Sequence, residues 1–168
     1  MSGATLAKKA LIDSVLVLFD EAYVGPQGTS SWFADSGPGT GILGTLEGVD
    51  PAAASRPLRA DDPLSAASHV GHVRYALSLA NRAAKGENPY KDADWSKSWD
   101  SRKVDAAEWK VLVAGLRKEY EEMRAALAEE KHWDDPDFVT GLISLIGHGA
   151  WHLGALRQGL GLVKAPRN

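Results

Sequence analysis

Four stretches of the chain carry apolar residues at three- and four-residue spacing, and this pattern constrains the fold more than any other feature. Such spacing places apolar side chains along one face of an α-helix. No stretch alternates between apolar and polar residues over a useful length, so few strands are expected. The pattern predicts an all-α four-helix bundle. Its helices are expected over Ala4–Tyr23, Asp62–Lys85, Asp105–Lys131 and Pro136–Gly159.

Three of these helices begin with recognisable start signals. Asp62 stands before Pro63, and Asp135 stands before Pro136, which is the order of an N-cap residue and a proline in the first turn. Asp105 is followed three residues later by a glutamate, which is the spacing of a capping box. The start of each of these helices is therefore placed at its aspartate.

Two connections are too long for a simple up-and-down bundle. Residues 24–61 are rich in Gly, Pro, Ser and Ala, and residues 86–103 contain Trp95 and Trp99. Connections of this length in a compact domain usually serve a function or carry a short helix. Trp32 and Phe33 lie in the glycine-rich part of the first connection, and we expect them to form a lid.

Length, charge and cysteine content exclude several classes of protein. A chain of 168 residues fits one domain, which we expect to span residues 1–168. A net charge of −3 offers no basic surface for nucleic acid. The sequence has no run of 18 apolar residues, so it predicts no membrane span. The absence of cysteine excludes thiolate ligands, so a metal site must use nitrogen and oxygen. We expect a cytoplasmic protein.

The histidines suggest a metal site. His148 and His152 are four residues apart, so both lie on one face of a helix where a single ion can bridge them. A third imidazole from a facing helix would leave one coordination position open, as in catalytic zinc sites. His69 and His72 are both candidates for that third ligand, and the helical wheel slightly favours His69. The alternative is that these histidines are ordinary buried polar residues.

Two segments resemble a known family. Ser65–Leu77 is similar to the second helix of the DinB/YfiT-like metalloenzymes, and Ile146–Gln158 is similar to their H-x-x-x-H fourth helix. The resemblance extends over nearly the whole chain in helix order and spacing, although its specific part is the histidines and their flanks. Transferred residue by residue, it implies metal ligands at His72, His148 and His152.

The same resemblance implies a function. Members of the family are four-helix bundles, commonly homodimers, that hold a divalent ion such as nickel or zinc, with iron as a further candidate. Some are transferases or isomerases that use a low-molecular-weight thiol. The resemblance therefore implies a metal-dependent transferase or hydrolase acting on a small molecule. A non-catalytic bundle that binds a metal or small ligand is the alternative.

The residues around the histidines add two expectations. No carboxylate lies within a turn of the predicted ligands on either helix, so the sequence shows no general base. Ser144, Tyr75 and Asp13 are candidate hydrogen-bond partners for the imidazoles. The last helix is apolar on more than one face, which predicts that a second copy of the chain covers part of it.

Overall fold

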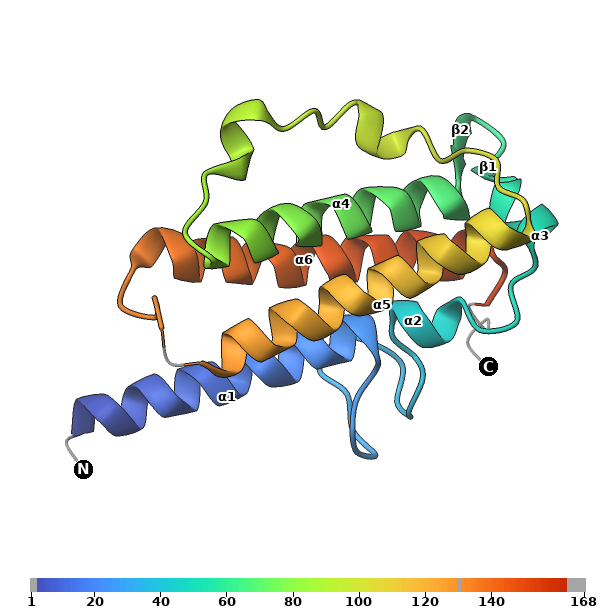
Figure 1. Ribbon diagram of the computed structural model, residues 1–168. Helices are drawn as coiled ribbons and strands as arrows, with labels where there is room; N and C mark the ends of the chain where they lie inside the picture. The colour runs from blue at the N-terminus through green and yellow to red at the C-terminus, as the bar shows by residue number, and fades with distance from the viewer. Residues whose placement is uncertain (1–2, 130, 163–168) are drawn as a thin grey trace.

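The fold is mainly helical, as a computed structural model describing residues 3–129 and 131–162 shows (Figure 1). Four long helices make up most of it. The helix α4 contacts α5 and α6, and α1 contacts the same two helices from the other side. This confirms the prediction of a helical fold. The long helices are α1 (Gly3–Tyr23), α4 (Ala66–Ala84), α5 (Ala106–Ala128) and α6 (Pro136–Gly159).

Both long connections contain short elements. The first carries two short helices and two strands, and the second carries two turns of 3₁₀-helix that run along the outside of α4 (Figure 1). The strands pair antiparallel, with Pro57 opposite Ser65 and Arg59 opposite Asp62. The short elements are α2 (Ile42–Thr45), α3 (Pro51–Ser55), β1 (Pro57–Arg59), β2 (Asp62–Ser65), η1 (Pro89–Asp92) and η2 (Lys97–Trp99).

The predicted start of the second long helix is wrong by four residues. Asp62 begins β2 instead, where its side chain accepts a hydrogen bond from the backbone N–H of Leu64 at 3.0 Å. Ser65 is the true N-cap, because its hydroxyl accepts from the N–H of Ser68 at 3.2 Å. An Asp-Pro pair serves a turn as well as a helix start, so its local signal was ambiguous.

The other two start signals are confirmed. In α5, Asp105 accepts from the N–H of Glu108 at 2.8 Å, and Glu108 accepts from the N–H of Asp105 at 2.9 Å, which completes the capping box. In α6, Asp135 accepts from the N–H of Asp137 at 2.9 Å.

Two acidic residues of α1 are buried and satisfied by other elements. Asp20 accepts from the hydroxyl of Tyr120 at 2.7 Å and from the guanidinium of Arg124 at 2.9 Å. Glu21, only 1% exposed, accepts from three consecutive backbone N–H groups of residues 32–34, at 2.8–2.9 Å. These contacts fix α5 and the first connection to α1.

The helix α6 is the most apolar of the long helices. Among the described residues, it is the one helix long and apolar enough to cross a membrane by length and composition, a criterion that core helices of soluble proteins also meet. Only 28% of its most apolar window is buried, and Ile143 and Trp151 are 56% and 60% exposed. One face of α6 therefore lacks a partner within the described chain.

Candidate metal centre

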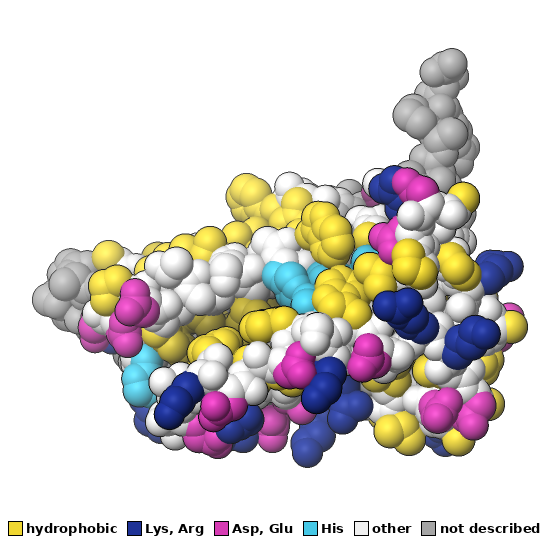
Figure 2. All heavy atoms as spheres, turned by 90° about the horizontal axis from the view of Figure 1, so that it is seen from above, with side chains coloured by type: hydrophobic (Ala, Val, Ile, Leu, Met, Phe, Trp, Pro, Cys, Tyr) yellow, Lys and Arg dark blue, Asp and Glu magenta, His cyan; other side chains and the backbone are white. Residues whose placement is uncertain are grey.

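Four histidines from two helices meet between α4 and α6. His69 and His72 project from α4, and His148 and His152 project from α6. His152 is fully buried, His69 and His72 are nearly so, and His148 is half-buried. The pairs come together because the two helices are in contact along this stretch. The space-filling view shows histidine side chains beside a hollow lined with hydrophobic groups (Figure 2).

Three of the four imidazoles converge through their Nε2 atoms. The Nε2 atom of His148 lies 3.0 Å from that of His72 and 3.0 Å from that of His152. One nitrogen of each ring falls within 4.8 Å of the others, an arrangement suited to a metal ion. We call these three residues the histidine cluster. Nitrogen ligands at 2.0–2.1 Å from a zinc ion lie roughly 3.3 Å apart in tetrahedral geometry, so the two 3.0 Å distances are within a few tenths of an ångström of that value.

A hydrogen-bond chain fixes the tautomer of His72. The Ser98 hydroxyl donates to the carbonyl of Trp95 at 2.6 Å, and its oxygen lies 2.6 Å from Nδ1 of His72. With its proton given to Trp95, the hydroxyl must accept from His72, so the proton of that ring sits on Nδ1. The Nε2 lone pair is then free and directed into the cluster.

His69 orients His152 from outside the cluster. The two Nδ1 atoms are 2.9 Å apart, so one donates to the other. A free lone pair on Nε2 of His152 requires the proton on its Nδ1, which then donates to His69. The structure thus places His72 in the cluster and His69 behind it. Helix packing, which a helical wheel does not describe, therefore gives these two histidines different positions relative to the cluster.

Burial keeps the imidazoles neutral. Burial lowers the pKa of His72 to about 4, and repulsion by His148 and His69 adds to the effect. The pKa of His152 is lowered still further, mainly by burial and then by repulsion from the other three histidines of the site. Burial also lowers the pKa values of His69 and His148. Neutral rings are the form that binds a metal.

Tryptophans cover the cluster. The indole of Trp99 stacks on His72 with ring centroids 3.9 Å apart, and Trp95 lies 5.8 Å from the same ring. Trp151 meets His152 edge-on at 4.6 Å. Two of these three indoles come from the second long connection, which runs over α4. Trp95 and Trp99 therefore overhang the histidines.

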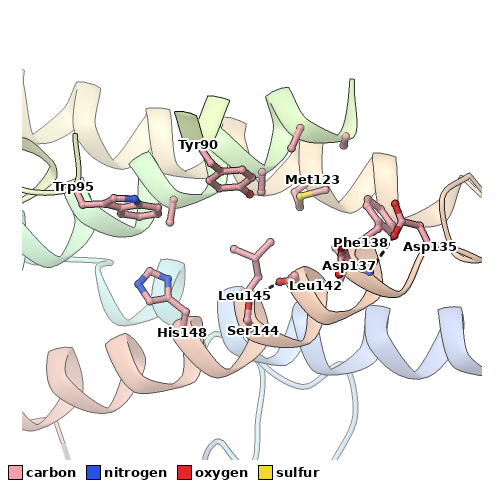
Figure 3. Close-up of a pocket in the computed structure, with 15 residues that line it drawn as sticks. Tyr90, Trp95, Met123, Asp135, Asp137, Phe138, Leu142, Ser144, Leu145 and His148 are labelled. Carbon is pink, nitrogen blue, oxygen red and sulfur yellow. Dashed lines mark hydrogen bonds between the residues drawn. The ribbon is translucent and has the colours of Figure 1, made fainter. Parts of the chain in front are cut away.

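Two hollows flank the histidines. One, of about 630 Å³, reaches His148 and runs between α4 and α6 toward the start of α6 (Figure 3). The other, of about 470 Å³, lies against His69, Trp151 and the β1–β2 hairpin, and includes Asp62. This aspartate raises the pKa of His69 against the dominant effect of burial. The first hollow therefore reaches a member of the cluster, whereas the second reaches only His69 behind it.

Several residues expected near the histidines are elsewhere. Ser144 donates to the carbonyl of Gly141, and Asp13 pairs with Lys9. Tyr75 accepts from the backbone N–H of Asp94, so it supports the second connection instead of an imidazole. The hydrogen-bond partners present are Ser98 and His69. Ser98 was missed because a serine in a short 3₁₀-helix of a connection has no sequence signature.

The predicted lid is also wrong. Trp32 lies against Val17 and Leu18 of α1 and lines neither hollow beside the histidines. Glu21 holds the backbone of this loop on α1 through the N–H groups described above. The glycine content of the loop indicated mobility, but the buried carboxylate that anchors it lies on another element.

A family model for the DinB superfamily matches residues 41–155. The match covers more than half of the chain, and it includes the four histidines that meet between α4 and α6. The chain belongs to the DinB superfamily, as the two histidine-bearing segments predict. No curated protein and no solved structure matches it.

Proposed function

We propose that the protein binds one divalent metal ion, nickel or zinc, through His72, His148 and His152. The observation that carries the proposal is the convergence of three Nε2 atoms. In two of these rings the Nδ1 atom is held by a neighbour: Ser98 holds that of His72, and His69 holds that of His152. Membership of the DinB superfamily supports it. Imidazole also suits iron, which is the third candidate.

We further propose that the bound ion serves a transferase or hydrolase reaction on a small molecule, with a low-molecular-weight thiol as co-substrate in the transferase case. A divalent ion lowers the pKa of the water or thiol that it binds. Side chains of the protein orient the ligands: His69 holds the imidazole of His152, and Ser98 holds that of His72. Trp99 shields His72 from water. Three protein ligands leave a position for substrate.

A non-catalytic binding protein is the alternative. It is favoured by one observation: in the described part of the chain, no carboxylate joins the group of residues that can hold the ion. A general base would then have to come from outside this group of residues or from the substrate itself. Exchange of bound water, measured by relaxation of solvent protons on the nickel or cobalt form, separates an open site from a closed one.

The deciding experiment is metal analysis of the purified wild type beside three single variants. His148→Ala and His152→Ala should lose the ion, and His72→Ala should lose it as well. His132→Asn is the matched control, because His132 is an exposed histidine with a positive φ of 62°, which asparagine tolerates. A wild type that carries no metal and takes up none in titration would end the proposal.

The remaining expectations are consistent with this function. We propose a single domain over residues 1–168 whose four long helices form a four-helix bundle. We propose a homodimer in which the exposed face of α6, with Ile143 and Trp151, is covered by a second copy. The capped ends of α6 and its buried histidine favour a soluble cytoplasmic protein over one in a membrane. The negative net charge gives no reason to expect nucleic acid.

A further inference from the structure

The larger hollow is a groove with the histidine cluster at one end. His148 lies at that end, and Asp135 and Asp137 lie at the other (Figure 3). His148 lies eleven positions after Asp137 on α6, which is roughly 16 Å of helix at 1.5 Å per residue. We call this hollow the α4–α6 groove.

The groove exists because its walls carry small side chains. On α4 the wall consists of alanines, and on α6 it includes Gly141 and Ser144. A Cβ atom added at Gly141 would meet nothing within 4 Å, so this part of the groove is open space. Tyr90 and Trp95 overhang it from the second connection, and Met123 and Leu145 contribute apolar surface. The alanines are Ala76, Ala80, Ala83 and Ala84.

The far end of the groove is acidic. Asp135 is engaged as the N-cap of α6, and Asp137 stands in the first turn beside it. Neither carboxylate forms an ion pair within the described ranges 3–129 and 131–162. At the end of α4, Arg82 pairs with Glu87, and Lys85 lies 3.7 Å from Glu122. The partial positive charge of the helix start offsets only part of two carboxylates.

We infer that the α4–α6 groove binds an amphiphilic molecule with an apolar body and a cationic amine. The apolar body lies along the alanine wall, the amine faces Asp137, and the opposite end reaches His148. An extended chain covers roughly 1.2 Å per bond, so the groove accommodates about 13 bonds. The inference rests on the proposed function only for the statement that the end at His148 is the reacting end; binding itself needs no metal.

A steric test uses two glycines on the same helix. Gly141→Leu places a side chain in the groove, and Gly147→Leu places the same side chain on an exposed turn of α6 that lines no hollow described here. Neither glycine has a neighbour that a Cβ would meet, and leucine is the better helix former, so both variants should fold. Gly141→Leu should weaken binding of decylamine at least tenfold, and Gly147→Leu should leave it unchanged.

A charge test compares three probes of one length. Full-length protein, as purified and after chelation of metal, is titrated by calorimetry with decylamine, 1-decanol and decanoate below their aggregation concentrations. Decylamine should bind about two- to fivefold more tightly than 1-decanol, as expected for a partly exposed ion pair, and decanoate more weakly than either. The preference should decrease as salt is added.

The preference for decylamine over 1-decanol also identifies the carboxylate that binds the amine. Asp137→Asn should remove this preference. Asp134→Asn should retain it, because Asp134 pairs with Lys8 and does not line the groove. Equal or tighter binding of decanoate, or unchanged binding to Gly141→Leu, would overturn the inference. If either result is found in a protein that still binds metal, the proposed metal-binding function is unaffected. If the protein binds no metal but still binds decylamine as described, the inference about the groove is unaffected.

Discussion

The Nδ1 atom of His69 lies 2.9 Å from the Nδ1 atom of His152, so a histidine on α4 orients a histidine on α6. The consequence is that His152 presents Nε2 to His148, again at 3.0 Å. His69, a candidate ligand by its position in the sequence, thus contacts a member of the histidine cluster from outside it. This relationship makes the roles of His69 and His72 separable by experiment.

His69→Ala should weaken metal binding without abolishing it. The variant removes the acceptor for His152 but leaves all three members of the histidine cluster, and loss of such a supporting contact typically lowers affinity about 10- to 100-fold. Competition titration with a chelator measures the change. Complete loss of metal would make His69 a ligand, and no change would mean that the contact with His152 does not matter for binding.

Ser98→Ala should have a comparable effect through His72. The serine hydroxyl holds Nδ1 of that ring at 2.6 Å, so its removal frees the ring to rotate or change tautomer, and metal affinity should fall about tenfold or more. Ser98→Thr should restore most of the affinity. Ser96→Ala is the control, because Ser96 is exposed and bonds Asp94 instead. Equal affinities in the two alanine variants would contradict the assignment.

Glu21→Gln should destabilise the protein at neutral pH by about 1–3 kcal/mol, because a buried carboxylate accepts several backbone N–H groups. Burial raises the pKa of Glu21, but the N–H groups of Ala34, Phe33 and Trp32 outweigh it, and the net pKa lies below the ordinary 4.5. A lowered folded-state pKa contributes stability above the ordinary pKa, which is lost as pH falls through the folded value.

Urea unfolding at several pH values measures this difference. The difference in the free energy of unfolding between wild type and Glu21→Gln should be constant from pH 6 to 8, a range above the ordinary pKa of 4.5. The difference should become smaller as the pH falls below 4.5. Glu47→Gln, at an exposed position, should show no such dependence. A gap that widens in acid would show that the sign of the pKa shift is wrong.

Tyr23→Phe and Tyr120→Phe should differ in their effect on stability. The two rings stack with centroids 5.6 Å apart, but only the Tyr120 hydroxyl has a partner, Asp20, at 2.7 Å. The buried Tyr23 hydroxyl has no partner among the described residues. Tyr120→Phe should cost about 1–3 kcal/mol, and Tyr23→Phe should be neutral or stabilising. Thermal unfolding measures both; a destabilised Tyr23→Phe would indicate an ordered water on that hydroxyl.

Ile143→Asp should convert the proposed dimer into a monomer. Ile143 is 56% exposed on the uncovered face of α6, so a charge there would be buried only in the dimer interface. Val111→Asp, 64% exposed on α5, is the control and should leave assembly unchanged. Sedimentation velocity at micromolar concentration distinguishes the two. A wild type that already sediments as an 18.0 kDa monomer would contradict the prediction.

Much of the helical architecture could be predicted because its determinants are local. The stripe from Trp109 to Leu127 is buried as its spacing requires, and the capping box at Asp105 starts α5 where expected. The error at Asp62 arose from the same local reasoning. The side chain of Asp62 accepts a hydrogen bond from the backbone N–H of Leu64. Asp62 lies in a strand because its segment pairs with residues 57–59, which local reasoning does not consider.

The sequence by itself determined the family, the helices, and the pair His148 and His152, since residues four apart on a helix share a face whatever surrounds them. Only the tertiary structure showed how the two histidines of α4 meet that pair. The rotation of α4 against α6 brings Nε2 of His72 to Nε2 of His148, and it brings Nδ1 of His69 to Nδ1 of His152. Ser98, the indoles over the cluster and the acidic end of the groove were likewise beyond sequence reasoning, because each depends on contacts between segments distant in the chain.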